Sequence, residues 1–529
     1  MYDLIIKNGQ IYDGTGNPAT QLDLGIKDGK IKKIGHLGDA EATQIIDAKN
    51  LAVSPGFIDA HSHSDLLCTK PEMQKVKLRQ GVTTELLGQD GISVAPVSDK
   101  TRPLWQQQLK ALNGDIGDWP WESIAEYLAF LEKSSIPCNA LYLVPHGAVR
   151  SLVMGFEERI ATKEEMEQMR LLVEEGMRQG AVGLSTGLEY TPNLYSDKDE
   201  LIEICKGSAK YHGSLVVHIR NEDDTCLEAL DEVVDVARQS GVRLHISHFK
   251  VAGEGNRDKY EIFLNKMMEA REEGIEVTFD QYPYVHGSTV LLSILPAWMH
   301  AGGTGKMLER LKDPKARAQV KADYDVSRGY KNFKDENEWK KITINFVATE
   351  ANKVLEGKTM YEVAELRKQD PFDAMFDLLI EEDAAVTMIV EWGFEEDIIY
   401  GMKHELQMVG SDGIFGGRPH PRVSGTFPRV LGKYAREEGV FTLAEAIRKM
   451  TAAPAQFLRL HDRGLLRENY WADIVIFDPK TVTDQATYED PMQAPIGIEY
   501  VIVNGEITIK QNEYTGTTSG KVIRLQDLA

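Results

Sequence analysis

The feature that most constrains the fold is an alternation of apolar, strand-like runs with helix-like runs along the middle of the chain. The strand-like runs recur at intervals of roughly 30 residues. Between them, apolar residues return at helical spacing, as at Leu227, Leu230, Val234 and Ala237. Eight candidate strands lie at 57–60, 82–87, 140–144, 181–185, 215–219, 243–247, 276–280 and 405–410. Eight such units predict an α/β fold built on a closed (β/α)8 (TIM) barrel, at residues 55–465.

Both ends of the chain show a different pattern, with short strand-like runs separated by turn signals. Asn8-Gly9 is one such turn signal within residues 1–54, and Asn504-Gly505 is another within residues 466–529. We expect the two ends to form one small antiparallel β-sandwich, with the barrel inserted between its halves.

The connection between the seventh and eighth strands is too long for one helix. Residues 288–346 within it carry helical and strand signals of their own, so we expect a small inserted domain there. Insertions at the carboxyl ends of barrel strands tend to cover the active site. The insert is therefore predicted to act as a lid or as a source of specificity.

The charge balance argues against some classes of partner. The 529 residues include 60 Lys and Arg against 82 Asp and Glu, a formal net charge of −22, which disfavours nucleic acid and anionic membrane surfaces. The four cysteines form no CxxC pair, so neither a disulfide scaffold nor a sulfur-rich zinc site is expected. The first residues lack a signal-peptide pattern, and no stretch reaches ~20 apolar residues. We expect a cytoplasmic protein and leave the formation of a homo-oligomer open.

Metal-binding residue types stand where the predicted strands end. His61 and His63 follow the first strand, His218 and His248 end the fifth and sixth strands, and Asp412 follows the eighth. Barrel enzymes build their sites at the carboxyl ends of the strands, so these side chains are expected to converge. Imidazole and carboxylate ligands suit Zn²⁺ or a related divalent ion, and a catalytic site of this kind leaves room for a water molecule.

Asp412 is the candidate for proton transfer. Within Gly410-Ser411-Asp412-Gly413 it has the sequence context of an ordinary turn residue. At the end of the last strand of a metal-binding barrel, however, a carboxylate can accept a proton from the attacking water and return it to a departing amine. We therefore predict that Asp412 is both a metal ligand and the general acid/base.

Several motifs carry a resemblance to a known family. The run PGFIDAHSHSD at 55–65, together with the histidines and Asp412 at the strand ends, resembles the amidohydrolase superfamily. GLSTGLEY at 183–190, HIRNE at 218–222, ISHFK at 246–250 and YPY at 282–284 resemble the N-acyl-D-amino-acid deacylase (D-aminoacylase) family, almost from end to end. The resemblance implies the same fold and a zinc-dependent hydrolysis of the amide of N-acyl-D-amino acids to a carboxylate and a free D-amino acid. The D configuration follows from the resemblance alone.

One position departs from the family pattern. Where the family has a metal-binding cysteine in a Gly-Asn-Cys-Gly stretch after the second strand, this chain has Gly88-Gln89-Asp90-Gly91. Asp90 is predicted to ligate or bridge one or two ions, the alternative being a loop aspartate that has lost this role. Because a carboxylate is a harder ligand than a thiolate, preference should move from Zn²⁺ towards Mn²⁺ or another harder ion.

The resemblance also implies a substrate-binding group. Lys250, Tyr282 and Ser288 are expected to bind the substrate carboxylate, and Tyr190 is expected to contribute to the same pocket. A cation and hydroxyl donors that converge on an anion agree with this role. The alternative is that these residues are ordinary polar lining of a barrel mouth.

Other polar residues near the motifs are given supporting roles or none. Arg220 and Glu222 follow His218 on the next loop and could pair with each other, so both are interpreted as supporting rather than catalytic residues. Arg422 is interpreted in the same way. His245 has the wrong strand parity for a ligand. No role is assigned to most of the remaining histidines: His146, His286, His404, His420 and His461.

Alternative functions stay open at this stage. A cyclic-amide hydrolase of the dihydroorotase or hydantoinase type, or an isoaspartyl-type dipeptidase, would use the same centre. The absence of a lysine at the end of the fourth strand weakens the first of these, because some branches of the superfamily carry a carboxylated bridging lysine there. A non-catalytic barrel homologue is the third alternative. The favoured partner is a small N-acyl amino acid.

Overall fold

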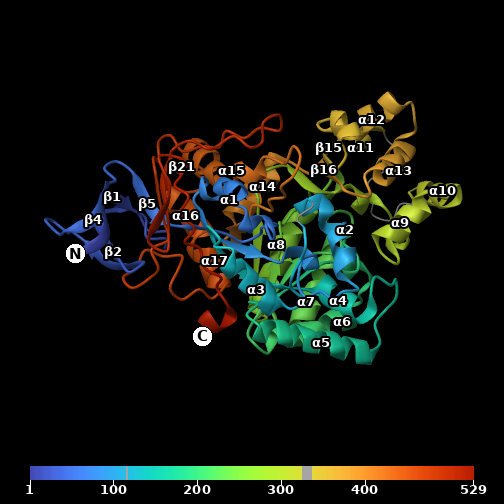
Figure 1. The fold of residues 1–529 in the computed structure, drawn as a ribbon, viewed down its shortest axis with the longest axis horizontal. Helices are drawn as coiled ribbons and strands as arrows, with labels where there is room; N and C mark the ends of the chain where they lie inside the picture. Colours follow the sequence, from blue (N-terminus) through green and yellow to red (C-terminus); the bar gives the residue numbers. More distant parts are fainter. Residues whose placement is uncertain (115–116, 325–335, 529) are drawn as a thin grey trace.

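The computed structural model describes residues 1–114, 117–324 and 336–528, and its centre is a barrel of parallel strands (Figure 1). Neighbouring strands pair in parallel within two hydrogen-bonded sheets, one of which holds the first three strands, and the strands are largely buried. The predicted (β/α)8 barrel is confirmed. Its strands are β6 (Phe57–Asp59), β7 (Val82–Leu87), β8 (Asn139–Tyr142) with β9 (Val144–Pro145), β10 (Leu184–Gly187), β11 (Ser214–His218), β12 (Arg243–Ile246), β13 (Val277–Gln281) and β17 (Gln407–Val409).

Most strands differ from their predicted ranges by one or two residues, and the third and fourth differ most. The third is interrupted at Leu143, where the hydrogen bonds pass from one neighbour to the other: Leu143 N donates to Leu87 O at 3.0 Å, and Val144 N donates to Gly183 O at 2.8 Å. The fourth begins at Leu184 rather than at residue 181. A Cβ at Gly183 would lie 2.8 Å from Ser214 Oγ, so this close approach requires glycine.

Helices cover the outside of the barrel, and their ends follow local sequence signals. α7 packs through Leu230, Val233 and Ala237 and ends at Gly241, whose φ of 75° is unfavourable for other residues. α5 starts with a capping box between Thr162 and Glu165. The helices between barrel strands include α1 (Pro71–Leu78), α5 (Lys163–Arg178), α6 (Lys198–Ala209), α7 (Cys226–Ser240), α8 (Lys259–Glu272) and α14 (Glu395–Lys403).

The two chain ends combine in one nine-stranded sheet, on the left in Figure 1. The halves meet where β5 pairs antiparallel with β18, with Ser54 opposite Val475. Residues of β18 alternate between an apolar cluster within the sheet, which includes Ile474 and Ile476, and a cluster shared with barrel helices, which includes Val475 and Phe477. The strands are β1 (Tyr2–Ile11), β2 (Thr20–Lys27), β3 (Lys30–Gly35), β4 (Ala42–Asp47), β5 (Ala52–Pro55), β18 (Ile474–Phe477), β19 (Ile498–Val503), β20 (Glu506–Lys510) and β21 (Glu513–Tyr514).

A separate antiparallel sheet lies between the seventh and eighth barrel strands, in the order β14-β16-β15. Its strands are β14 (His286–Val290), β15 (Ile342–Val347) and β16 (Val386–Glu391). The predicted insert at 288–346 begins inside β14 and ends inside β15, so the sheet also includes residues beyond that range. Residues 325–335 of the predicted insert lie outside the described residues. Helices α9 (Thr304–Leu311), α10 (Pro314–Asp323), α11 (Glu336–Lys340), α12 (Met360–Arg367) and α13 (Pro371–Glu381) accompany it, away from the N-terminal strands (Figure 1).

Two further observations bear on the sequence interpretation. All four cysteines are buried and unpaired. Within the described residues, no helix combines the length and the apolar character needed to cross a membrane. The boundaries assigned to the individual domains stay a prediction.

Candidate metal centre

The barrel topology brings the six predicted metal ligands to one end of the barrel. Each stands at or just after the end of a strand, and His61 and His63 both follow β6. Asp90 lies in a short 3-10 turn after β7, and His218 is the last residue of β11. The full set is His61, His63, Asp90, His218, His248 and Asp412, all buried.

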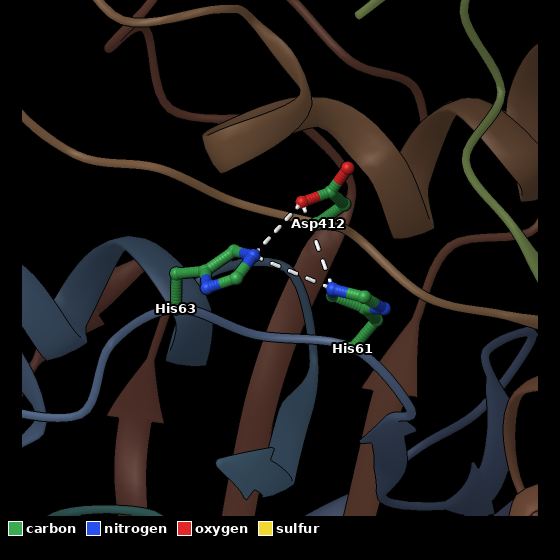
Figure 2. A group of neighbouring side chains, drawn as sticks. All are labelled: His61, His63 and Asp412. Atoms are coloured by element: carbon green, nitrogen blue, oxygen red, sulfur yellow. Dashed lines mark hydrogen bonds and ion pairs between the residues drawn. The ribbon is translucent and has the colours of Figure 1, made fainter. Parts of the chain in front are cut away.

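The first group is formed by side chains from the first, second and last strands. His61 Nε2 lies 3.4 Å from His63 Nε2. Asp412 Oδ1 lies 3.7 Å from His61 Nε2 and 3.3 Å from His63 Nε2 (Figure 2). Asp90 Oδ2 approaches the same two nitrogens at 3.6 and 3.3 Å. Both carboxylates therefore lie within 3.7 Å of both imidazole nitrogens.

The second group lies beside the first and shares Asp90 with it. His218 Nδ1 is 2.8 Å from His248 Nε2, and Asp90 Oδ1 is 3.9 Å from the same His248 nitrogen. The ring centroids of His61 and His248 are 5.0 Å apart. Asp90 thus stands between two clusters of ligand atoms. Three overlapping sets have the spacing of a metal site: His61, His63 and Asp412; His61, Asp90 and His248; and His218, Glu222 and His248.

Local features of these residues fit a divalent ion. Asp90 Oδ1 is buried without a hydrogen-bond partner, which is costly unless another ligand satisfies it. Asp90, His248 and Asp412 have φ values of 56°, 35° and 48°, and backbone strain of this kind clusters at functional sites. Imidazole nitrogens with carboxylate oxygens are the donor set of Zn²⁺ and Mn²⁺ sites. The residues present are therefore suited to hold such an ion.

The electrostatic field of the centre also favours a cation. Burial opposes a charged imidazole, yet Asp90 and Asp280 raise the pKa of His61 well above its usual value. Burial likewise opposes a charged carboxylate, but His61 brings the pKa of Asp90 well below its usual range. The pKa of Asp412 is lowered too, against the effect of its burial, chiefly by Arg422. Both carboxylates therefore stay ionised and attract positive charge.

The four predicted substrate-binding residues line one cavity of about 180 Å³ together with most of the ligands. Lys250 Nζ is already bound by Glu222 Oε2 at 2.6 Å. Ser288 Oγ is buried and makes no hydrogen bond, so it is available to a bound molecule. The Tyr190 hydroxyl lies 3.1 Å from Thr289 Oγ1.

Arg220 and Glu222 do not pair with each other. Arg220 turns towards α7, where its Nε donates to Glu232 Oε2 at 2.9 Å, and it also donates to the backbone oxygen of Leu194. Glu222 instead points into the cavity, where its Oε1 lies 3.1 Å from His248 Nδ1. Glu222 is therefore part of the centre's immediate surroundings.

Arg422, interpreted from the sequence as a supporting residue, lines the cavity itself. Its Nη1 lies 3.0 Å from Asp412 Oδ2, and its guanidinium lies 4.6 Å from the centre of the Tyr282 ring. Its Nε is buried without a hydrogen-bond partner. Arg422 therefore connects the candidate proton-transfer residue to the candidate substrate-binding residues.

Sequence reasoning missed two residues that orient the histidines. Asp280 Oδ1 accepts a hydrogen bond from His248 N at 2.9 Å, and its Oδ2 lies 3.6 Å from His61 Nδ1. His245, which was given no ligand role, holds Asp280 through its Nε2 at 2.8 Å. The sequence could have indicated Asp280, because it ends the predicted seventh strand, and histidines stand at the same position on the fifth and sixth strands. A carboxylate behind a metal-binding imidazole fixes its orientation.

Comparison with known proteins agrees with this geometry. The chain is 34% identical to a D-aminoacylase from Alcaligenes xylosoxydans xylosoxydans, with 99% of this chain and 97% of the relative covered. It also matches the crystal structure of N-acyl-D-glutamate deacylase from Bordetella bronchiseptica, complexed with zinc and a phosphonate mimic of the tetrahedral intermediate. That match has a TM-score of 0.84 and 32% identity, and covers 99% of both chains. A D-aminoacylase structure with a binuclear metal centre matches with a TM-score of 0.84 and 31% identity, over 99% of this chain and all of that one.

The family model of the amidohydrolases matches residues 44–509, which include the whole barrel and parts of both terminal segments. The resemblance seen in the sequence motifs is thereby confirmed. The chain belongs to the amidohydrolase family, in the branch that contains the D-aminoacylases.

Proposed function

We propose that this protein is a metal-dependent hydrolase that cleaves the amide of N-acyl-D-amino acids to a carboxylate and a free D-amino acid. The observation that carries the proposal is the position of Asp412, with one oxygen 3.3 Å from His63 Nε2 and the other 3.0 Å from Arg422 Nη1. This carboxylate stands between the ligand cluster and the substrate-binding residues. The proposed ligands of one or two Zn²⁺ or Mn²⁺ ions are His61, His63, Asp90, His218, His248 and Asp412.

The proposed chemistry divides between the ion and the chain. An ion bound by these residues supplies a Lewis acid and lowers the pKa of a water molecule. Asp412, which is ionised because its own pKa is lowered, accepts the proton of the attacking water. It then returns that proton to the nitrogen of the cleaved amide. Asp280 and Glu222 keep the imidazoles oriented through this exchange.

The proposed substrate carboxylate lies at the Tyr282 side of the cavity. Ser288 Oγ and Arg422 Nε are buried donors without partners. The centre of the Tyr282 ring lies 4.6 Å from the guanidinium of Arg422 and 6.0 Å from Lys250 Nζ. Hydroxyl and guanidinium donors bind a carboxylate with defined geometry. Lys250 contributes charge although Glu222 balances part of it, and Tyr190 closes the pocket near β14.

Part of the cavity lining is apolar, which bears on the choice of substrate. Val290, Ile342, Met388 and Val390 line it, and all come from the inserted sheet. Among the described lining residues, the lysine and the arginine are each paired with a carboxylate. We therefore expect an apolar side chain to be preferred over the second carboxylate of a glutamate or aspartate substrate.

The direct test combines metal analysis with measured amine release. Purified protein would be assayed with N-acetyl-D- and N-acetyl-L-amino acids, with and without added Zn²⁺ or Mn²⁺, and after removal of metal by a chelator. The proposal expects release from the D series only, lost on chelation and restored by metal. Release from the L series alone, or release that persists after complete removal of metal, would refute it.

The same assay separates the alternative functions. Hydantoins, dihydroorotate and isoaspartyl dipeptides would be included as substrates. The cyclic-amide interpretation is weakened because β10 (Leu184–Gly187) has no lysine that could be carboxylated to bridge two metals. Protein that binds no metal would favour a non-catalytic homologue. We also propose a cytoplasmic location, which the unpaired cysteines support.

A further inference from the structure

The barrel closes at a seam between β6 and β17, its first and last strands, which belong to separate hydrogen-bonded sheets. The backbone contacts across this seam include a long bond from Ala60 N to Val409 O, at 3.4 Å, and one from Asp412 N to His61 O, at 2.8 Å. His61 and Asp412 both stand on the seam. The groups that hold the two strands together therefore also set the distance between two proposed metal ligands.

One buried carboxylate bridges the seam. Asp59 Oδ1 accepts hydrogen bonds from the backbone nitrogens of Ser411, at 2.8 Å, and His61, at 3.3 Å. Asp59 Oδ2 accepts from the Ser411 hydroxyl at 2.6 Å and from the Lys77 ammonium at 2.7 Å. Side-chain bonds thus strengthen a place where the regular strand ladder is weak.

Lys77 extends this network beneath the segment that carries the first two histidines. Its fully buried Nζ, on α1, donates to Ser411 Oγ at 2.7 Å and lies 3.6 Å from Glu85 Oε1. Glu85 Oε1 accepts from the hydroxyls of Ser62 at 2.7 Å and Ser64 at 2.8 Å. Burying an ammonium with two carboxylates is expensive, and a stabilising role alone is weak grounds for it.

We propose that Asp59, Lys77 and Ser411 form a positioning clamp that fixes Asp412 relative to His61 and His63. The inference rests on the proposed function, because the clamp has this purpose only if those residues hold a metal ion. The three clamp residues are absent from the lining of the cavity. They act through the ligands and make no contact with the substrate.

The backbone of Asp412 explains why a clamp is needed. Its φ of 48° is unfavourable for an aspartate and persists only where neighbouring contacts hold it. Ser411, the preceding residue, is bound to Asp59 through both its nitrogen and its hydroxyl, and the hydroxyl also accepts from Gly413 N at 3.2 Å. Loss of the Ser411 hydroxyl would remove its bonds to Asp59 Oδ2, Lys77 and Gly413 N and leave only the backbone bond to Asp59.

The test compares Ser411→Ala and Lys77→Met with the wild type. The readouts are the dissociation constant for Co²⁺ by chelator competition, the visible absorption spectrum of the Co²⁺-loaded protein, and kcat and KM for an N-acetyl-D-amino acid. In Ser411→Ala we expect Co²⁺ affinity to fall about 10-fold or more, with an altered spectrum. The value of kcat should fall, while KM changes less because the carboxylate-binding residues are untouched.

Lys449→Met is the matched control. Lys449 is also a buried lysine, but its Nζ donates to His404 O at 2.6 Å. His404 precedes β17, whereas Asp412 and the other proposed ligands lie at or beyond the carboxyl ends of the strands. This variant should keep the wild-type Co²⁺ affinity and spectrum even if it melts at a lower temperature.

Ser411→Ala decides the outcome, because it retains the ion pair between Lys77 and Asp59 even if Lys77→Met fails to fold. Wild-type affinity and spectrum in Ser411→Ala would overturn the clamp alone. Absence of Co²⁺ binding in the wild type, together with absence of amine release, would remove the proposed function and the clamp together.

Discussion

The floor and the wall of the cavity differ in origin and in chemistry. The floor is made by the ends of the barrel strands and carries the imidazoles and carboxylates, such as His63 and Asp412, which are tied together by hydrogen bonds and ion pairs. The wall is made by the inserted sheet and carries apolar side chains such as Ile342 and Met388. The floor is typical of a reacting centre, and the wall of a surface that selects a ligand by shape.

This contrast predicts that the two regions have separable effects on catalysis. Changes in the floor should alter metal binding and kcat, because they affect groups that act on the reacting atoms. Changes in the wall should alter KM and the preference between substrates, because apolar contacts bind ground state and transition state alike. The predictions below test this separation, beginning with the largest expected effect.

Replacing Asp412 by Asn should cause the largest loss. The amide keeps the size of the side chain but cannot accept the proton of the attacking water, so kcat should fall by about 10³-fold or more, with a much smaller change in KM. Steady-state kinetics with an N-acetyl-D-amino acid would measure both values, and metal analysis would establish that the ion is retained. Near-normal kcat in a metal-loaded variant would remove Asp412 from the chemistry.

Asp90 tests whether the floor holds metal between its two ligand groups. Asp90→Ala should weaken metal binding by at least about 10-fold, because Asp90 oxygens approach histidines of both groups at 3.3 and 3.9 Å. Asp90→Cys should instead retain metal but shift the preference from Mn²⁺ to Zn²⁺. Competition with a chelator would give the affinities. Unchanged metal content and affinity in Asp90→Ala would show that Asp90 is only a loop residue.

The floor was more predictable from sequence than the wall. His61, His63, His218 and His248 each end or follow a strand in a repeating unit, so their convergence depends only on the period of the barrel. Asp90 could be placed in the same way once the second strand was identified. Such positions are determined by backbone topology, which alternating apolar runs indicate strongly.

The remaining contacts depend on loops, and sequence spacing does not determine loop conformation. Glu222 lies two residues from Arg220 and looks like its partner, yet the loop directs it to Lys250. Arg422 reaches Asp412 because α15 (Arg422–Arg429) starts beside the cavity. The wall was predicted only as an insert, because its third strand, β16, pairs with segments far away in the sequence.

Met388 tests the role of the wall. Met388→Ala removes apolar contact area from the cavity, so KM for an N-acetyl-D-amino acid with a large apolar side chain should rise about 10-fold with little change in kcat. N-acetyl-D-alanine should be affected less. Met360→Ala, in α12 of the same insert but outside the cavity lining, is the control for loss of packing. A large fall in kcat for Met388→Ala would contradict the division between floor and wall.

Asp223, at the rim of the floor, gives the smallest predicted effect, which is a change in stability and not in catalysis. Burial, with a contribution from Glu189, raises the pKa of Asp223 to about 6. The folded protein therefore keeps this proton where the unfolded chain, with a pKa near 3.9, has lost it. Stability falls as pH rises from about 4 to about 6, by at most ~3 kcal/mol. Asp223→Asn cannot titrate, so its unfolding free energy relative to wild type should increase across that window, as urea titrations at several pH values would measure. If the difference in unfolding free energy between the two proteins stayed constant with pH, the carboxyl group of Asp223 would be as well solvated as in the unfolded chain. The burial that shifts the pKa values of the floor residues would then not extend to Asp223.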